Sequence, residues 1–485
     1  MKPLNCLLLL LLHFGPQPGA AQSLANELTL DQVIELALAQ SAVAKQTQTS
    51  RDQSYWQWRS YQADYKPQLG LQGVVPGFSR AVTPVVQPDG TTDFRAVRIN
   101  NSNLALTASQ NIGLTGGQVF VASEVQRFDD FNRSLKRYNN QPVAIGLTQP
   151  IGRFNSLRWA RRIEPLRYQE SQRLYAEERE TIAQRITELY FDVLQQQVNA
   201  EVASQNVQAN QELLRLGKER HQLGQLSQSD LLRLELNLLN ARQAMAQGQL
   251  DAQNAAVRLQ SYTGVRPQTL RLAVPVAAPR LVVPTGQALT EARQNRSVVL
   301  AFSRRLLEAE RVVAQARGTT GFQATLSANL GYVNQAPNLW DTYAALQNQQ
   351  QVQLTFALPL VDWGRQKAIV KTAELTRRQV QIDVSQEEAT FEQTVQVQAG
   401  QLSTLGEQLS LATLADSLAQ QRYAIAQATY KVGRISLTDL TIASAEKDQA
   451  RRAYILALRA AWVAHYRLRA LTLYDFERQL PLAAK

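Results

Sequence analysis

Apolar residues recur at steps of three and four positions over two unusually long segments of the chain. The first segment runs from residue 155 to about 217 and the second from about 364 to 432. This spacing predicts amphipathic helices, and the abundance of Gln, Glu, Ala, Leu and Arg favours them. At about 1.5 Å per residue, each helix would be roughly 90–100 Å long, many times the average for globular proteins. Such lengths indicate coiled-coil packing or a helical tube.

Both long helices are predicted to stop at a glycine and turn back into a shorter helix. Glycine tolerates the left-handed backbone that ends helices, and a Ser-x-x-Asp motif soon afterwards has the spacing of a capping box. The two copies of this motif are Gly224, Ser227 and Asp230, and Gly433, Ser436 and Asp439. The return helices are expected at about 228–262 and 437–471, so each half of the chain forms a helical hairpin with a tight tip.

Shorter segments alternate between apolar and polar residues, which is the period-two pattern of β-strands. The second half has such strands at 322–332 and 351–358, and the first half has counterparts at about 67–78 and 143–149. Strands with one apolar and one polar face are typical of outer-membrane barrels. A half-buried sheet in a soluble protein has the same pattern, so the alternation alone leaves both possibilities open.

Tryptophan residues flank these strands and favour the membrane interpretation. Trp56 and Trp58 precede the first strand, while Trp159 and Trp363 follow the two return strands. Trp and Tyr are enriched at membrane–water interfaces. Core packing is the alternative explanation for some of these side chains.

The same order of elements occurs twice, which indicates two fused copies of one unit. Landmarks of the first copy recur at one constant offset in the second: Pro150, Gly224 and Asp230 as Pro359, Gly433 and Asp439. The predicted domains are a signal peptide (1–21), a first repeat (22–264) with a helical hairpin at 155–263, a linker (265–285), a second repeat (286–475) with a helical hairpin at 363–471, and a tail (476–485). The first copy also contains an insertion with a further hairpin, 104–125. This hairpin is expected to lie outside the cell or, alternatively, to add strands to the barrel.

The first residues have the composition of a secretory signal peptide. Lys2 gives the positive start, the leucines up to Leu12 give the apolar segment, and small residues at 19–21 give a cleavage site. The only cysteine of the chain, Cys6, lies in this segment, so the mature protein has no disulfide framework. After it, no apolar stretch reaches the ~18 residues of a membrane-spanning helix. A soluble exported protein and a β-barrel membrane protein are the remaining classes.

Charge and candidate chemistry argue against nucleic-acid binding and catalysis. The net charge of +11 is spread along the predicted helices, whereas a nucleic-acid site needs a basic patch with aromatic residues. The histidines after the signal segment, His221 and His465, are far apart in sequence, and we find no metal-ligand spacing, nucleophile elbow or phosphate loop. We therefore predict no catalytic residues, no metal and no cofactor.

The predicted strands require several copies of the chain. Two strands in each repeat give four per chain, which cannot close a barrel by themselves. Unpaired strand edges are not tolerated in lipid because their N–H and C=O groups have no partners there. Several chains must therefore share one barrel.

At this point the chain resembles the TolC family of outer-membrane efflux channels. The resemblance depends on the duplicated Gly-x-x-Ser-x-x-Asp-Leu tip, on the opening segment at 28–37, and on strand exits with Pro followed by Gly-Arg. It implies a mainly α fold with β: long antiparallel helical hairpins that form a periplasmic α-barrel, and a twelve-stranded barrel shared by a homotrimer. The implied function is a passive exit duct of a tripartite efflux or type I secretion system. A periplasmic coiled-coil adaptor or scaffold is the alternative.

The resemblance also implies partners and roles for the tip residues. The partners are outer-membrane lipid, a periplasmic adaptor (membrane fusion) protein and an inner-membrane pump. Gly224, Ser227, Gly433 and Ser436 match the adaptor-contact tips, with simple helix termination and capping as the alternative or additional role. Asp230, Asp439 and Tyr430 match positions at the periplasmic aperture.

Overall fold

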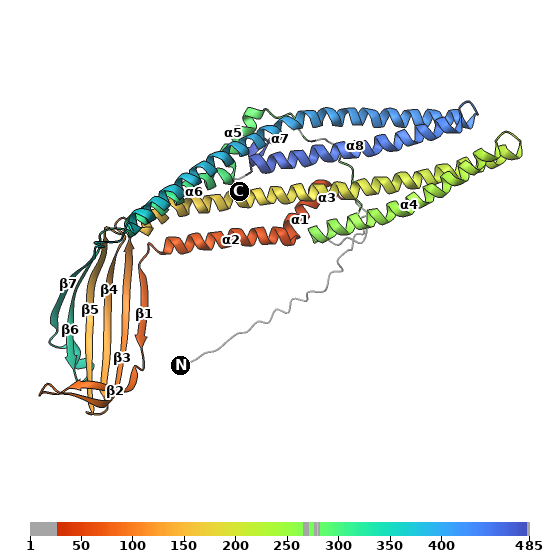
Figure 1. The fold of residues 1–485 in the computed structure, drawn as a ribbon. Coiled ribbons are helices and arrows are strands. Elements are labelled where there is room, and N and C mark those ends of the chain that lie inside the picture. The colour runs from red at the N-terminus through yellow and green to blue at the C-terminus, as the bar shows by residue number, and fades with distance from the viewer. Residues whose placement is uncertain (1–26, 265–270, 276–278, 280–281, 483–485) are drawn as a thin grey trace, which may run out of the picture. The chain divides into compact units, whose positions relative to one another are not determined.

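The structure is a computed structural model of the 485-residue chain and describes residues 27–264, 271–275, 279 and 282–482 (Figure 1). The predicted signal peptide, 1–21, and part of the predicted linker therefore lie outside the described residues. The chain divides into two compact units. One comprises residues 1–37 and 189–277, and the other comprises residues 38–188 and 278–485.

The first unit is a helical hairpin with a short N-terminal helix. Its elements are most of α1 (Leu30–Gln40), the C-terminal part of α3 (Ser156–Gln222) and all of α4 (Gln228–Thr263). Val207 of α3 packs with Leu238 and Ala241 of α4 in a buried cluster. A Cβ at Gly248 would lie 3.3 Å from the Cα of Ala200, so the missing side chain lets the two helices approach closely.

A buried tyrosine fastens the start of the described chain to this hairpin. The Tyr190 hydroxyl lies 2.9 Å from the carbonyl oxygen of Leu28 and 2.6 Å from that of Ala273. Leu28 also forms a parallel β-bridge with Leu272. Burial raises the pKa of Tyr190, so its hydroxyl keeps the proton that it donates to this junction.

The second unit contains the remaining helices and the main β-sheet. Its helices are the N-terminal part of α3, α2 (Ala42–Ala63), α5 (Thr285–Asn295), α6 (Ser297–Thr319), α7 (Arg365–Lys431), α8 (Leu437–Thr472) and the short η1 (Trp340–Tyr343). Arg304 of α6 bonds both carboxylate oxygens of Glu170 on α3, at 2.5 and 3.0 Å, and also reaches Glu308 one turn along its own helix. In the described part of the chain, none of the helices combines the length and hydrophobicity of a membrane-spanning helix.

Helix lengths repeat almost residue for residue between the two halves of the chain. In the first half α1, α2, α3 and α4 have 11, 22, 67 and 36 residues. In the second half α5, α6, α7 and α8 have 11, 23, 67 and 36 residues. The predicted duplication is therefore present in the helices, and the long helices begin and end within a few residues of the predicted positions.

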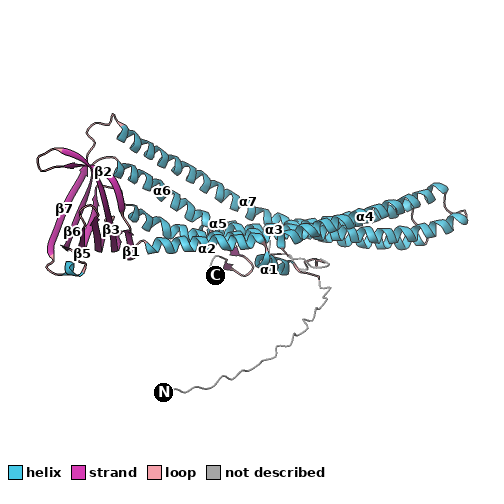
Figure 2. Ribbon diagram, turned by 90° about the horizontal axis from the view of Figure 1, so that it is seen from below, coloured by secondary structure: helices cyan, strands magenta, loops and turns pink. Residues whose placement is uncertain are grey.

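The strands form one antiparallel sheet within the second unit (Figure 2). Its strands are β1 (Gln68–Val74), β2 (Phe78–Val86), β3 (Thr92–Ile112), β4 (Gly117–Asp130), β5 (Leu135–Ile151), β6 (Gln323–Ala336) and β7 (Gln347–Ala357). Six of them lie in one row in the order β1-β3-β4-β5-β6-β7. The seventh, β2, pairs with the first half of β3, while β1 pairs with the second half.

The strand count corrects one expectation from the sequence. The chain contributes six strands to the row and not four, because β3 and β4 take in the predicted hairpin 104–125 and pair with β1 and β5. The turn of this hairpin faces the helices: the Asn155 amide, next to the start of α3, donates to the carbonyls of Gly113 and Leu114 at 3.2 and 3.1 Å. Residues 104–125 are therefore part of the sheet, with their turn at its helical end, as the alternative of additional strands requires.

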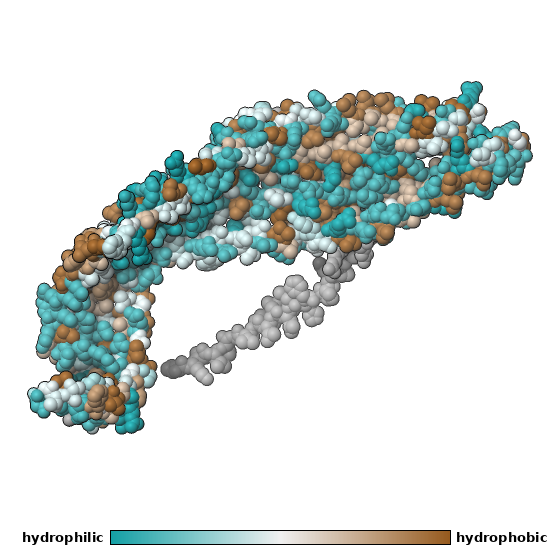
Figure 3. Space-filling model, in the orientation of Figure 1, coloured by the Kyte–Doolittle hydropathy of each residue, from teal (hydrophilic) through white to brown (hydrophobic). Residues whose placement is uncertain are grey.

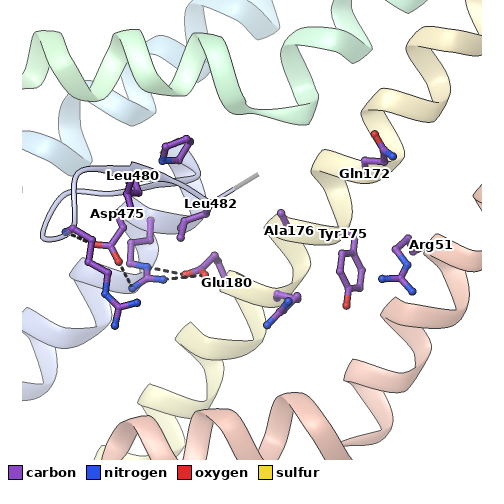
Figure 4. Close-up of a pocket in the computed structure, with 12 residues that line it drawn as sticks. Arg51, Gln172, Tyr175, Ala176, Glu180, Asp475, Leu480 and Leu482 are labelled. Atoms are coloured by element: carbon purple, nitrogen blue, oxygen red, sulfur yellow. Dashed lines mark hydrogen bonds and ion pairs between the residues drawn. The ribbon is translucent and has the colours of Figure 1, made fainter. Parts of the chain in front are cut away.

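The C-terminal residues form a small hairpin instead of the predicted tail. Strands β8 (Tyr474–Asp475) and β9 (Leu480–Pro481) pair directly after α8. Arg469 at the end of α8 joins this hairpin to α3, because its guanidinium lies 3.0 Å from the Glu180 carboxylate and 3.3 Å from that of Asp475 (Figure 4). All three side chains are largely shielded from solvent.

Candidate membrane face and hairpin tips

One face of the sheet is apolar across neighbouring strands. Directly paired residues of antiparallel strands point to the same face, so the strand registers can be followed from strand to strand. One such track runs from β1 to β6 through Leu69, Ala108, Val121, Ile145 and Leu330. Ile145 is 58% exposed and Leu330 is 53% exposed in the single chain. A continuous apolar face of this kind marks a surface that another apolar medium covers.

The opposite face of the sheet is polar. The corresponding track from β3 to β7 runs through Asn111, Gln118, Thr148, Ser327 and Gln353. Alternation of an apolar outer face with a polar inner face is the pattern of a membrane barrel around a water-filled lumen. The registers thus show which residues of neighbouring strands share the apolar face and which share the polar face.

Aromatic and apolar side chains gather where the sheet meets the helices. Figure 3 shows hydrophobic surface in this region, and the exposed residues between β7 and α7 are Leu358, Leu360, Val361 and Trp363. Trp363 is 96% exposed. Trp159 lies in the first turn of α3, with the Arg162 guanidinium 4.9 Å from its ring. Both positions fit the predicted role at the membrane–water interface.

The two tryptophans of α2 have different surroundings. Trp58 stacks on Tyr168 of α3, with ring centroids 5.3 Å apart and planes 5° from parallel. This contact fits the core-packing alternative. Trp56, on the same helix, is exposed.

Sequence reasoning missed an aromatic pair at the other end of the sheet. Trp340 and Tyr343 lie in η1 between β6 and β7, with ring centroids 6.2 Å apart, and both are exposed. They lie at the opposite end from the junction with the helices, where a second interfacial belt is expected for a barrel. Their position directly after an alternating strand was the signal that could have revealed them.

The tip of the second helical hairpin has both the helix-ending glycine and the complete capping box that the sequence predicts. Gly433 adopts a left-handed backbone with φ of 76°. The Ser436 hydroxyl accepts from the Asp439 backbone N–H at 3.1 Å, and the Asp439 carboxylate accepts from the Ser436 N–H at 3.2 Å. Hydrogen bonds from the Ser436 hydroxyl and N–H lower the pKa of Asp439, which is exposed and therefore stays ionised at lower pH than an ordinary aspartate.

The first tip is similar but differs in detail. Gly224 has φ of 70°, and the Ser227 hydroxyl accepts from the Asp230 N–H at 3.1 Å while donating to its carboxylate at 2.7 Å. His221 precedes this glycine by three residues, and its Nδ1 lies 2.8 Å from the Leu226 carbonyl oxygen. The corresponding residue of the second tip, Tyr430, is only 4% exposed in the single chain.

The fold, the amphipathic sheet and the capped hairpins define the class of outer-membrane channel proteins with long helical extensions. The sequence matches the family described as Outer membrane efflux protein over residues 104–265 and 288–472, and the chain belongs to this family. The match takes in both repeats, which excludes the adaptor or scaffold alternative. No curated protein matches the sequence.

Solved structures share the fold at low sequence identity. The CmeC outer membrane channel of Campylobacter jejuni has a TM-score of 0.63 and 16% identity, covering 91% of this chain and 85% of that chain. VceC of Vibrio cholerae has a TM-score of 0.64 and 16% identity, covering 91% of this chain and 96% of that chain. MtrE of Neisseria gonorrhoeae, solved in an open state, has a TM-score of 0.63 and 15% identity, covering 91% and 88%.

These findings establish what the chain does in outline. It is an outer-membrane efflux protein, with the fold of solved outer membrane channels. The TolC-like fold predicted from the sequence is confirmed, and the family is one of channels and not of enzymes. Within the part of the chain that the structure describes, no group of three or more His, Cys, Asp or Glu residues could hold a metal ion.

Proposed function

We propose that the chain works as a homotrimer, a passive exit duct that receives substrates from an inner-membrane pump through a periplasmic adaptor protein. The trimer is favoured because one sheet with two free edges cannot enclose a lumen, and edges in lipid must be paired. The helices then continue the duct into the periplasm.

The hairpin tips are the proposed contacts with the adaptor. Each tip ends in a left-handed glycine followed by an exposed serine cap, at Gly224 and Ser227 in one hairpin and at Gly433 and Ser436 in the other. Their capping role and an adaptor-contact role are compatible, because a rigid, well-defined turn is a good docking surface. The duplicated motif offers the adaptor two related sites on each chain.

The periplasmic aperture is the proposed selectivity element. In a trimer Asp230 forms one ring of three carboxylates and Asp439 forms another. Rings of carboxylates in a constriction favour cations. Tyr430, three residues before Gly433, is the third proposed aperture residue, and its side chain is buried in the single chain.

The observation that carries this proposal is the repeated capping geometry, which fixes an aspartate in the first turn of each return helix. Alanine at both Asp230 and Asp439 is expected to reduce the preference for cations. A single charge interaction at 4 Å in water is worth about 1 kcal/mol, so the permeability ratio of potassium over chloride should fall roughly fivefold. The ratio is obtained from reversal potentials in planar bilayers under a salt gradient.

The pH dependence of the same measurement isolates Asp439. Because its pKa is lowered, the single Asp230→Ala variant should keep cation preference as pH falls below the ordinary aspartate value and lose it only at more acidic pH. Adding Ser436→Ala removes the hydroxyl hydrogen bond, the larger of the two that lower this pKa, while the backbone N–H bond remains, and should move the loss part of the way to higher pH. An unchanged permeability ratio in the variant with both Asp230→Ala and Asp439→Ala would refute the aperture assignment.

A further inference from the structure

Both ends of the row of strands are unpaired on their outer side in the described part of the chain. The row begins with β1, which pairs only with β3, and ends with β7, which pairs only with β6. Each edge strand therefore presents a line of backbone N–H and C=O groups without partners from the sheet. In a lipid environment such groups must find partners elsewhere.

The two edge strands lack the features that protect free edges. Natural proteins guard exposed edges with charged side chains, prolines or bulges. The sequences of β1, Gln-Leu-Gly-Leu-Gln-Gly-Val, and of β7, Gln-Asn-Gln-Gln-Gln-Val-Gln-Leu-Thr-Phe-Ala, contain no charged residue and no proline. Arg80 and Pro84 occur in β2, which lies beyond β1 on the same side of β3. On this side of β3, only the edge formed by β1 therefore lacks charged residues and proline.

The strand directions allow these edges to join between copies. Every pair in the row is antiparallel, so with six strands β1 and β7 run in opposite directions. When two copies stand in the same orientation in a membrane, β7 of one and β1 of the next form a further antiparallel pair. An odd number of strands would give a parallel pair at this seam.

The two faces also match across this seam. On β1, Leu69 and Leu71 belong to the apolar face and Gln72 to the polar face. On β7, Leu354 belongs to the apolar face and Gln353 to the polar face. Joining the edges therefore continues the apolar face from Leu69 and Leu71 of β1 to Leu354 of β7 and the polar face from Gln72 to Gln353. Gln350, which pairs with Leu330, lies on the apolar face farther from the helical end of β7.

We propose that β1 of each copy pairs with β7 of the next and that three copies close an eighteen-stranded barrel. The inference rests on the trimer of the proposed function and adds the number of strands and the seam between subunits. Three copies of six strands give eighteen, against the twelve that the family resemblance implies. Since barrel diameter grows roughly linearly with strand number, the outer wall is about one and a half times as wide as a twelve-stranded wall. Barrels of this size hold an aqueous channel.

Cysteine pairs across the seam test the pairing. Cys6 lies in the predicted signal peptide, so the mature chain offers a cysteine-free background. Gln72→Cys on β1 is combined with one cysteine on the lumen face of β7, and the four partner positions tested in turn are Gln349, Gln351, Gln353 and Thr355. Opposite residues on one face lie close enough for a disulfide. At least one combination should give a covalent trimer on non-reducing gels.

Control pairs use the same β1 cysteine with Val352→Cys or Leu354→Cys, whose side chains lie on the other face of β7. These pairs should remain monomeric on the gel. If every lumen-face pair stays uncross-linked in a protein that is trimeric in detergent, the seam is refuted while the trimer stands. Particles that are not trimeric would instead refute the proposed function.

A second experiment tests whether β3 and β4, which contain the insertion of the first repeat, belong to the barrel wall. Leu106→Cys on β3 and Val121→Cys on β4 should be protected from a membrane-impermeant maleimide in lipid vesicles, because they face lipid. Their neighbours on the lumen face, Thr107→Cys and Ala122→Cys, should react at least tenfold faster. Equal reactivity of the two sets would mean that β3 and β4 lie outside the wall, and the eighteen-stranded barrel would be excluded.

Discussion

Replacing Leu330 with arginine is expected to prevent assembly of the channel in the outer membrane. Leu330 lies near the middle of β6, on the apolar face of the sheet, and half of its side chain is exposed in the single chain. An arginine on the lipid face near the bilayer midplane costs about 2–4 kcal/mol in a membrane barrel. In a trimer this cost occurs three times. The measurement is the amount of trimer in the outer-membrane fraction, judged by its shift on gels after heating.

Ser327→Arg is the matched control for this substitution. Ser327 lies three residues earlier on the same strand and belongs to the polar track, so its replacement faces the lumen. We expect near-normal amounts of trimer for this variant and a change only in conductance. Equal assembly of the Leu330→Arg and Ser327→Arg proteins would contradict the assignment of the two faces.

Replacing Arg469 with leucine is expected to destabilise the junction between α8, α3 and the C-terminal hairpin by about 3–5 kcal/mol. Removing one partner of a shielded ion pair leaves the opposite charges uncompensated, and that is the origin of the cost. Here Arg469 neutralises two carboxylates, Glu180 and Asp475, so its loss leaves two buried negative charges. Limited proteolysis of the C-terminal residues and thermal unfolding in detergent measure the effect.

The pH dependence of this junction has a definite sign. Burial opposes ionisation of Asp475, but backbone hydrogen bonds and the Arg469 guanidinium prevail and lower its pKa. The stabilisation by this carboxylate is therefore present above the ordinary aspartate pKa and is lost as pH falls through the lowered value. In the Arg469→Leu protein the loss should begin at higher pH.

Arg478→Leu provides the control for the same residue change. Arg478 lies in the same C-terminal hairpin and is exposed, and it is its backbone N–H that donates to the Asp475 carboxylate, at 3.1 Å. Its stability should stay within about 0.5 kcal/mol of the native protein. A comparable loss in both variants would mean that hydrophobic substitution, and not the missing ion pair, causes the effect.

The long helices could be predicted closely from the sequence because their signals are local. Apolar periodicity extends over many turns, and the ends carry Gly224, Ser227, Gly433 and Ser436, whose backbone angles or hydrogen bonds appear in the structure as expected. The capping motifs act within four residues, so no distant partner is needed to specify them. The positions of Asp230 and Asp439 in the first turn of the return helices could be predicted for the same reason.

The sheet was harder to predict because alternation identifies a strand but not its neighbours. Residues 104–125 alternate like the other strands, yet their position depends on pairing with β1 and β5. The turn at Gly113 is held by Asn155, and no local pattern encodes that contact. The expectation of four strands followed from the repeat, which the insertion interrupts.

The C-terminal hairpin was missed for a similar reason. Arg469 and Glu180 are separated by 289 positions, so their ion pair could not be read from spacing. Charged residues on long helices usually face solvent, and the sequence offered nothing to distinguish these two from the others. Burial of Asp475 and Phe476 becomes visible only when the helices are packed.

The number of copies in the purified particle tests the central claim most directly. Light scattering in detergent, with the detergent mass subtracted, gives the protein mass of one particle. The account predicts three copies of the chain, stable only in detergent or lipid, because a lone sheet leaves β1 and β7 unpaired. A folded single copy that remains dispersed in water without detergent would contradict it.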